Sequence, residues 1–385
     1  RLDFPDLLRH AQRLLAEDSV ARLYRMHFGI VLVDEFQDLT EQQLDIVCAI
    51  SNNNLTFAGD PGQAIFSFTG ANVDAVQTRI RNLPDLRVVT FSTSYRSSPA
   101  VLNLVSTIGR SIGSPQVLSA NPSKWPGGGL VACCQYETQT DEARAVKNIV
   151  DCIIGPRNDV SVGIISRVFY RRLTVDEIFR SVSQYPVRYW DNPAYSPDVV
   201  RVLRTEMKAL EADPALNDSE RLAQLEELAL SAVDSNDIDL RIDISEAVAF
   251  LRDMTASGLD LSSAVNSIRI EDSPNLPIGP GVHILNAHIG KGQQFDWVVM
   301  LGLEEGIIPD RRARNEELEE EQRTLLVMAS RARTGAIATS VRYSDGRYGP
   351  KPEALSRWWS FVESCQTCNE SSLLESITST QTVAC

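Results

Sequence analysis

Two carboxylates follow directly on a short apolar run in the first tenth of the sequence. The run Gly29-Ile-Val-Leu-Val33 ends at Asp34 and Glu35, a pattern typical of a buried parallel strand that leads into a polar loop. One such carboxylate can hold Mg²⁺, and its neighbour can orient or deprotonate a water molecule that attacks a phosphate. Two acids that cap a following helix would give the same local sequence. The pair by itself therefore leaves a nucleotide-hydrolysis site and a solvated turn open.

Two further polar clusters stand at the ends of predicted strands. A strand over Leu55–Ala58 ends in Gly59-Asp-Pro-Gly62, and a third strand over Arg87–Phe91 is followed by Ser94-Tyr-Arg-Ser97. A helix over Glu41–Ile50 separates the first two strands. Strand, polar loop and helix in repetition predict an α/β fold with a parallel sheet. In such sheets ligands bind at the carboxyl ends of the strands, where all three clusters lie.

The remaining chain continues the alternation of strands and helices, with one interruption. Residues 198–265 carry helical periodicity and acidic clusters, which indicate a helical insertion. The Ser/Thr-rich residues 346–385 are predicted to be poorly ordered. The other predicted elements are helices from Pro99 to about Arg110, over 141–154 and over 316–333, and strands near Leu130–Cys134, Val160–Ile165, Val282–Leu285 and Trp297–Leu301.

Bulk properties restrict the class of protein. A chain of 385 residues is long for one hydrophobic core, so we expect two domains or one domain with a large insertion. The net charge of −14 argues against a surface that is basic throughout, so any DNA contact must come from a local groove. Residues 1–25 have the pattern of an amphipathic helix, and no run of 18 apolar residues occurs. Cys365 and Cys368 form a lone CxxC, for which free cytosolic thiols are favoured over a zinc site.

The order of the clusters along the chain is more specific than any single cluster. The sequence DEFQD at 34–38 is followed by GDPGQAIFSFTGA at 59–71 and by SYRS at 94–97. HIGKGQQFD at 288–296, GLEEGIIP at 302–309 and EEQRTLLVMASRA at 320–332 come next. This set resembles motifs II to VI of the superfamily 1 DNA helicases of the UvrD/Rep/PcrA type, over about residues 3 to 340.

The resemblance implies a role for each matched residue at an ATP site. Asp34 and Glu35 would be the Mg²⁺ ligand and the water-activating carboxylate, and Gln63 would sense the γ-phosphate. Arg96 and Arg331 would be γ-phosphate arginines, which suit this task because the planar guanidinium reaches two oxygens at once. Taken singly, either arginine could also be a surface salt bridge. The list of implied nucleotide-binding residues is completed by Tyr95, stacked on the adenine, Gly292 and Gln294.

The resemblance also implies contacts with DNA. Phe66 and Phe68 match aromatic positions that stack on single-stranded bases, and core packing is the alternative for Phe66. His288 matches a histidine near the DNA backbone, and a capping or buried histidine is its alternative. Lys291 could approach a phosphate, or its loop could simply turn the chain.

Four departures from the family pattern qualify these implications. Thr69 stands where the family has arginine, Gln294 where it has glutamate, and Leu326 where tyrosine is usual. The sequence GxxxxGK[ST], whose amides and lysine cradle the phosphates, occurs nowhere in the chain. We therefore expect the chain to begin inside the first of two RecA-like units and to hydrolyse no ATP alone.

The expected fold is α/β, with two RecA-like P-loop-NTPase-type parallel-sheet domains, the first truncated, and a helical insertion in the second. The expected segments are 1–93 (first RecA-like domain), 94–205 and 276–345 (second domain), 206–275 (reduced accessory insertion) and 346–385 (tail).

The expected function of the complete protein is that of a cytoplasmic ATP-dependent DNA helicase or translocase. It would use ATP and Mg²⁺, act 3′ to 5′ on single-stranded or duplex DNA in repair or replication, and have no membrane contact. A protein partner, a nuclease or repair factor, is compatible with the acidic insertion. Two alternatives stay open: a DNA-stimulated ATPase or translocase of a nuclease or phage-defence complex that does not unwind, and a non-catalytic interaction module.

Overall fold

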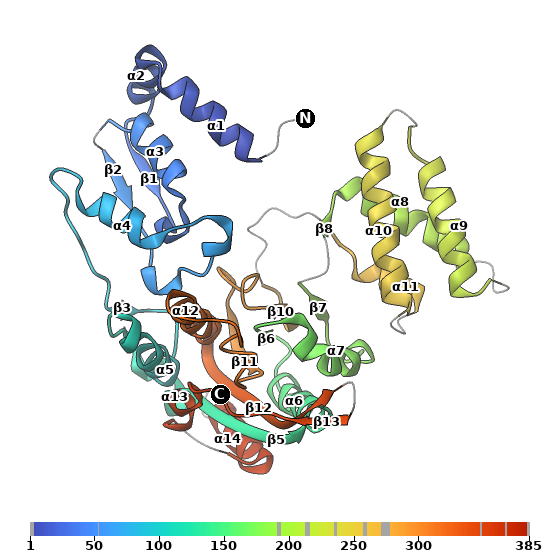
Figure 1. Cartoon of the computed structure of the whole chain (residues 1–385). Coiled ribbons are helices and arrows are strands. Elements are labelled where there is room, and N and C mark those ends of the chain that lie inside the picture. The colour runs from blue at the N-terminus through green and yellow to red at the C-terminus, as the bar shows by residue number, and fades with distance from the viewer. Residues whose placement is uncertain are drawn as a thin grey trace.

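A computed structural model describes residues 4–52, 54–190, 194–211, 216–234, 237–256, 260–270, 278–346, 349–365 and 368–382. These residues form three lobes, coloured from blue through green and yellow to red in Figure 1. We call them the N-terminal lobe (helices α1 to α4), the sheet lobe (the large sheet and its helices) and the helical lobe (helices α8 to α11). The N-terminal lobe and the sheet lobe meet at a junction that carries the residues of interest below.

Six parallel strands form the centre of the sheet lobe. They are hydrogen-bonded in the order β5-β12-β11-β6-β10-β7, and β13 pairs antiparallel with the end of β12. All six residues of β6 are buried, as expected for a strand covered on both faces. The strands are β5 (Leu130–Thr138), β6 (Ser161–Ser166), β7 (Val187–Tyr189), β10 (Gly281–Asn286), β11 (Phe295–Leu301), β12 (Ala332–Gly346) and β13 (Gly349–Pro352).

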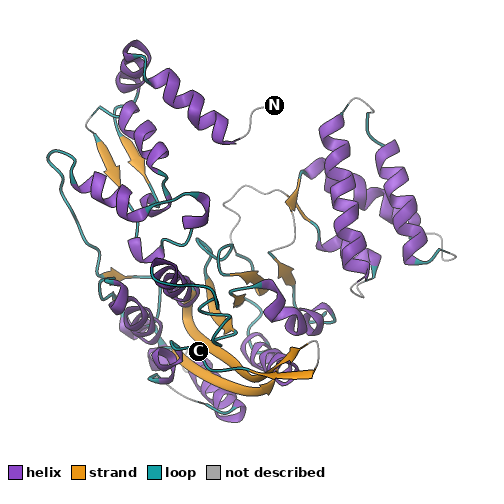
Figure 2. Ribbon diagram, in the orientation of Figure 1, coloured by secondary structure: helices purple, strands orange, loops and turns teal. Residues whose placement is uncertain are grey.

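Helices cover both faces of this sheet (Figure 2). Alternation along a strand sends Val298 and Met300 of β11 into one core, and Val299 and Leu301 into the other. The first core is closed by α5 (Pro99–Gly109), α12 (Glu316–Ser330) and α13 (Trp359–Glu363). The second is closed by α6 (Gln139–Ile154), α7 (Leu173–Arg180) and α14 (Glu370–Thr382). The large sheet thereby has the α/β layering predicted from the sequence.

The helical lobe is inserted between two strands that are neighbours in the sheet, β7 and β10. Its helices bury an apolar core of their own, which includes Leu203, Leu225 and Leu251. Its elements are β8 (Ala194–Tyr195), α8 (Pro197–Leu210), α9 (Asp218–Ser231), α10 (Ile238–Ala256), α11 (Leu261–Ser267) and β9 (Arg269–Ile270), and β8 pairs parallel with β9.

The N-terminal lobe contains a two-stranded parallel sheet in which Val31 pairs with Leu55 and Val33 with Phe57. Helix α3 begins at a capping box, because Thr40 accepts from the Gln43 amide and Gln43 reaches back to the Thr40 amide. Since β1 and β2 run parallel, the loops that follow them leave the same edge of the sheet. The elements are α1 (Phe4–Leu15), α2 (Asp18–His27), β1 (Val31–Val33), α3 (Glu41–Ile50), β2 (Leu55–Phe57) and α4 (Val73–Arg81), with 3₁₀ turns at Phe36–Asp38, Pro61–Gln63 and Ser67–Thr69.

Two sequence-based predictions of local structure are wrong, and the helical prediction for 1–25 is confirmed as two helices. Arg87–Phe91 is not a strand: Val88 and Phe91 are exposed, and pairing begins only at β3 (Thr93–Ser94), which pairs with β4 (Leu118–Ser119). Strand propensity alone does not make a strand where no neighbouring strand pairs with it. The region predicted as one helix over 1–25 is divided into α1 and α2, with residues 1–3 outside the described part.

The C-terminal tail is also ordered, against the prediction for 346–385. Trp358 and Trp359 are buried in one core of the sheet lobe, and Leu373 and Ile377 of α14 are buried in the other. The many Ser and Thr residues of the tail lie around apolar positions at helical spacing, which pack against the sheet lobe. Residues 347–348, 366–367 and 383–385 lie outside the described residues.

Among the residues described here, every helix is too short or too polar to span a lipid bilayer.

Candidate functional site

Asp34 and Glu35 leave the end of β1 as an exposed pair of carboxylates. Asp34 Oδ1 accepts a hydrogen bond from the Glu35 amide at 2.9 Å. Glu35 has φ +52°, in the left-handed region that side chains other than glycine rarely adopt. Such a conformation costs about 1–3 kcal/mol and persists only where surrounding contacts hold it. The turn after β1 is therefore held by contacts that lie beyond the strand.

Gln37 supplies one of those contacts. It is 1% exposed, and its Nε2 donates to Glu35 Oε2 while its Oε1 accepts from the Asp60 amide at 3.0 Å. Gly59 makes this approach possible, because a Cβ on Gly59 would lie 2.3 Å from Gln37 Oε1. Gln37 thus ties the loop after β1 to the loop after β2.

The second loop continues the chain of hydrogen bonds toward the sheet lobe. Asp60 Oδ2 accepts from Gln63 Nε2 at 2.9 Å, and Gln63 Oε1 accepts from Arg331 Nη2 at 2.8 Å. We call Glu35, Gln37, Asp60, Gln63 and Arg331 the junction relay. It joins a carboxylate of the N-terminal lobe to a guanidinium of the sheet lobe through an unbroken series of hydrogen bonds.

Arg331 follows the last residue of α12 and is 3% exposed. Besides Gln63, its guanidinium donates to Ser330 Oγ at 2.8 Å and to the carbonyl of Val327 at 3.1 Å. Burial and, to a smaller extent, the charge of Arg96 lower the pKa of Arg331 to about 10, while Glu35 and Asp60 oppose the shift. The guanidinium is shielded from water, which strengthens its interactions with other charges. Its N–H groups donate to oxygens of the protein, and an anion could accept these hydrogen bonds instead.

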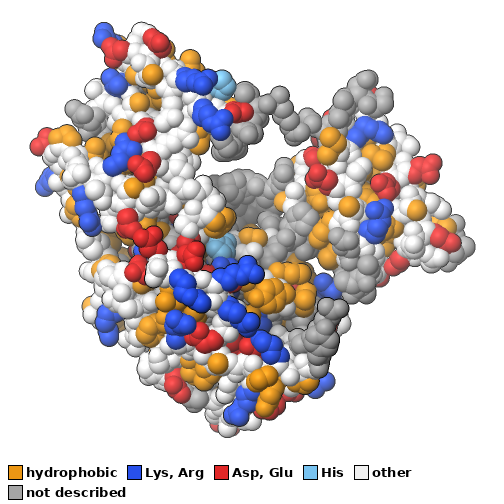
Figure 3. Space-filling view, viewed as in Figure 1, with side chains coloured by type: hydrophobic (Ala, Val, Ile, Leu, Met, Phe, Trp, Pro, Cys, Tyr) orange, Lys and Arg blue, Asp and Glu red, His pale blue; other side chains and the backbone are white. Residues whose placement is uncertain are grey.

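Arg96 lies close enough to this group to take part in the same electrostatic field. Desolvation lowers the pKa of Arg96, the charge of Arg333 lowers it as well, and Glu35 raises it. Glu35 therefore shifts the pKa of both Arg96 and Arg331. Figure 3 shows basic and acidic side chains close together where the N-terminal lobe meets the sheet lobe. An acidic pair and two guanidinium groups thus share one junction.

An aromatic cluster lies on the same junction. The rings of Phe66 and Phe68 are 5.8 Å apart, and His288 of the sheet lobe is 6.2 Å from the first and 5.4 Å from the second. Burial and, to a smaller extent, the charge of Arg167 lower the pKa of His288 to about 4, while Glu320 opposes the shift. His288 is thus a neutral ring that contacts both phenylalanines, of which Phe68 is 70% exposed.

The other predicted residues differ in their exposure and contacts. Tyr95 is 76% exposed. Gly292 has φ +84° and open space around the position of a Cβ, and Gln294 Oε1 accepts a long hydrogen bond of 3.4 Å from Arg333. Lys291 is bonded to Asp38 and to the backbone of Gln63. The roles predicted for all these residues stay predictions.

The donor set at β1 fits the way proteins hold Mg²⁺, which takes one or two carboxylates and fills its other positions with water and phosphate oxygens. In the described part of the chain, no three His, Cys, Asp or Glu side chains converge as a cage for a metal ion. Asp34 and Glu35 alone would therefore have to be complemented by substrate oxygens.

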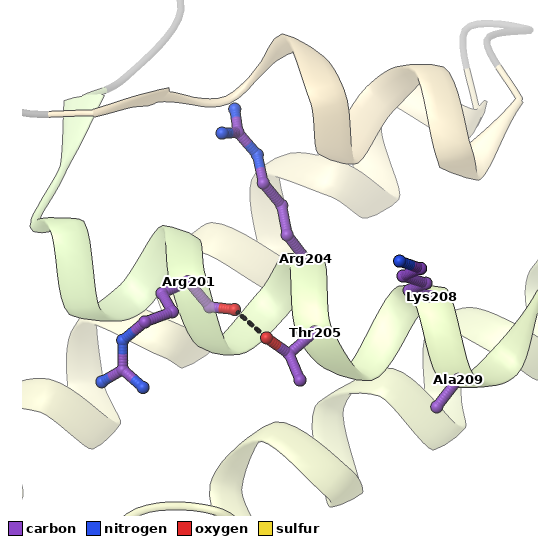
Figure 4. Close-up of a pocket in the computed structure, with 5 residues that line it drawn as sticks. All are labelled: Arg201, Arg204, Thr205, Lys208 and Ala209. Atoms are coloured by element: carbon purple, nitrogen blue, oxygen red, sulfur yellow. Dashed lines mark hydrogen bonds between the residues drawn. The ribbon is translucent and has the colours of Figure 1, made fainter.

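A separate hollow lies on the helical lobe, on the exposed face of α8. Figure 4 shows its lining residues, Arg201, Arg204, Thr205, Lys208 and Ala209. All five come from one helix, and none belongs to the junction relay. The chemistry of the junction is therefore independent of this hollow.

Family models match two long segments of the chain. The model of the UvrD/REP helicase N-terminal domain matches residues 1–84, and that of the UvrD-like helicase C-terminal domain matches residues 180–341. Together they cover more than half of the sequence and contain the whole junction relay. The chain belongs to the UvrD-like helicase family.

Individual relatives within this UvrD-like family are distant. The ATP-dependent DNA helicase UvrD2 of Mycobacterium tuberculosis is 29% identical over 377 residues, covering 91% of this chain and 53% of the relative. UvrD1 of Mycobacterium leprae is 21% identical over 457 residues, covering 86% and 58%. The chain spans little more than half the length of these relatives. A solved C-terminal domain of a possible DNA helicase from Lactobacillus plantarum covers 71% of this chain and 98% of its own, at 13% identity and a TM-score of 0.30.

Two relay members, Gln37 and Asp60, received no role from the sequence. Their letters stand inside the motifs at 34–38 and 59–71. The residue types alone indicate that both can form hydrogen bonds, because an amide donates and accepts and a carboxylate accepts. Which atoms they bind depends on how the two loops approach each other, and that is a property of the fold.

Proposed function

We propose that the whole protein is an ATP-dependent DNA helicase or translocase. It moves 3′ to 5′ on single-stranded DNA and couples ATP hydrolysis to strand separation in DNA repair or replication. The junction relay is the observation that carries this proposal, because it connects a water-activating carboxylate in one lobe with a phosphate-binding guanidinium in another. A motor needs such a link, because the binding and hydrolysis of ATP must change the orientation of one lobe relative to the other.

The proposed architecture follows from the same placement. The N-terminal lobe is part of one RecA-like unit, the sheet lobe is the second, and the helical lobe is an accessory insertion in the second. The insertion of the helical lobe between paired strands β7 and β10 supports this division. The predicted boundaries at 93, 205, 275 and 345 are part of the proposal.

The chemistry at the site is phosphoryl transfer to water. Asp34 and Glu35 would hold Mg²⁺, which neutralises charge on the phosphate oxygens when bound. Glu35 orients the attacking water, and its position is set by the hydrogen bond from Gln37. Arg331 exchanges its bond to Gln63 for a bond to a phosphate oxygen, and an arginine in that role contributes about 10³–10⁵ in rate. Arg96 contributes a second positive charge, and Tyr95, Gly292 and Gln294 contact the rest of the nucleotide.

Coupling to DNA runs through the loop that contains Gln63. Phe66 and Phe68 follow Gln63 on that loop and stack on bases, each stack contributing about 1–3 kcal/mol. His288 contacts the backbone of the DNA strand as a neutral hydrogen-bond donor or acceptor, consistent with its lowered pKa. Release of Gln63 by Arg331 would shift the aromatic rings because Gln63 and Phe66 are three residues apart.

The test is ATP hydrolysis and strand separation by the whole protein, with and without single-stranded DNA. We expect DNA-stimulated turnover, unwinding of duplexes with a 3′ overhang, and loss of turnover in Glu35→Gln. Turnover without unwinding would favour the translocase of a nuclease or phage-defence complex. No turnover in the whole protein would favour a non-catalytic interaction module. The chain of residues 1–385 alone, which contains no GxxxxGK[ST] sequence, should hydrolyse no ATP.

A further inference from the structure

Lys291 is more deeply buried than a DNA-contacting lysine would be. It lies in the loop after β10, and its side chain is only 6% exposed. Its ammonium donates to both oxygens of Asp38, at 2.6 Å and 2.6 Å, and to the carbonyl of Gln63 at 2.7 Å. An ammonium has three N–H donors, so these bonds use all of them. The ring of Phe66 lies beside the same ammonium, 5.0 Å from its centroid.

The two partners of Lys291 lie on different loops of the N-terminal lobe. Asp38 ends the 3₁₀ turn after β1, and Gln63 ends the turn after β2. One side chain of the sheet lobe therefore holds both loops at once. Gln63 is fixed at two points, its carbonyl by Lys291 and its side-chain amide by Arg331. The Lys291 contact thus holds the backbone of Gln63, while separate hydrogen bonds to Asp60 and Arg331 hold its side chain.

An ion pair on the surface would not hold two loops in place, because exposed pairs contribute little to stability. The Lys291–Asp38 pair differs in its exposure, 6% and 24% for the two side chains, and in its third bond to a backbone carbonyl. When one member of a desolvated pair is removed, its partner is left without compensation, so the loss is far larger than on the surface. The geometry is therefore that of a structural clamp across the junction.

We propose that Lys291 is a positioning residue that clamps the loops of Asp38 and Gln63 onto the sheet lobe and thereby places Gln63 against Arg331. The catalytic consequence of the clamp rests on the proposed function, whereas the clamp itself does not. In this role the charge of Lys291 is used inside the protein, and the strand of DNA is contacted by neighbouring groups instead.

Hydrogen–deuterium exchange on the chain tests the clamp without any nucleotide or DNA. Lys291→Met and Asp38→Asn should each accelerate exchange in peptides covering 36–40 and 60–66, by at least about tenfold. The double variant should add little to either single change, because both remove the same contact. Lys124→Met removes the charge of an exposed lysine elsewhere on the sheet lobe and should leave these peptides unchanged. Unchanged exchange in both junction variants would overturn the clamp.

DNA binding and turnover by the whole protein separate the clamp from a phosphate contact. Loss of a single-strand phosphate contact would lower the slope of log Kd against log salt by about 0.7. For a clamp, Lys291→Met keeps the wild-type slope, lowers kcat at saturating DNA, and is matched by Asp38→Asn. A reduced slope together with normal exchange would overturn the proposal. If Lys291→Met fails to fold, the milder Asp38→Asn decides by exchange in the same two peptides, since loss of an acidic side chain removes no phosphate contact that the salt slope could report. If the whole protein hydrolyses no ATP, the proposed function fails, and the exchange result still decides on the clamp.

Discussion

Replacing Gln63 by glutamate keeps the size of the side chain and changes the charges of the junction relay. The Gln63 side chain accepts from Arg331 Nη2 at 2.8 Å and donates to Asp60 Oδ2 at 2.9 Å. In Gln63→Glu the first bond becomes one between opposite charges, and the second becomes a repulsion between two carboxylates. The wild-type bond already has one charged partner, and in the variant a second, opposite charge at hydrogen-bond distance adds about 1 kcal/mol or more. The contact with Arg331 should therefore gain about 1 kcal/mol.

The stronger bond to residue 63 keeps Arg331 from binding the phosphate. A difference of about 1 kcal/mol reduces the fraction of freed Arg331 by about fivefold, and repulsion from Asp60 displaces the loop in addition. We expect kcat for DNA-stimulated ATP hydrolysis by the whole protein to fall by about fivefold or more. Gln63→Met, which removes both bonds, should instead weaken the dependence of turnover on DNA. Wild-type turnover and wild-type DNA stimulation in both variants would refute the reasoning.

Three further predictions concern stability. Gly59→Ala places a Cβ 2.3 Å from Gln37 Oε1, so we expect a loss of about 1–3 kcal/mol in urea unfolding, whereas Gly29→Ala, with no atom within 4 Å, should change little. Burial lowers the pKa of His283 to about 4. The folded protein therefore favours the neutral ring, and this adds about 3 kcal/mol to the free energy of unfolding above pH 6.5, a contribution that is lost as the pH falls toward 4. In His283→Asn the free energy of unfolding should lack this pH dependence. Arg171→Met leaves two buried glutamates without their partner and should reduce the unfolding free energy by about 3–5 kcal/mol.

The large sheet could be predicted because its strands depend on sequence-local patterns. Strands β6, β10 and β11 are mostly apolar and almost entirely buried, a pattern that arises when both faces of a strand are covered. The placement of polar loops after β1 and β2 follows from the same rule, since parallel strands end at one edge. Sequence patterns thus located Asp34, Glu35 and Gln63 at one edge of a sheet.

The hydrogen bonds between the residues of the site could not be predicted in this way. The sequence did not indicate that the ammonium of Lys291 bonds to Asp38, which is 253 residues away in the sequence. Gln37 acts through the Asp60 amide, a partner fixed only when two loops pack. Such contacts depend on side-chain directions across lobes, and neither periodicity nor residue type determines them.

The most direct test of the central claim is a double-mutant cycle between Glu35 and Arg331. DNA-stimulated kcat of the whole protein would be measured for Glu35→Gln, Arg331→Lys and the double variant. If both residues act on one phosphate through the junction relay, each single change should lower kcat by about 10³ or more, and the double variant should be little worse than the poorer single variant. Losses that multiply, or a single variant with wild-type turnover, would show that the two residues do not serve one site.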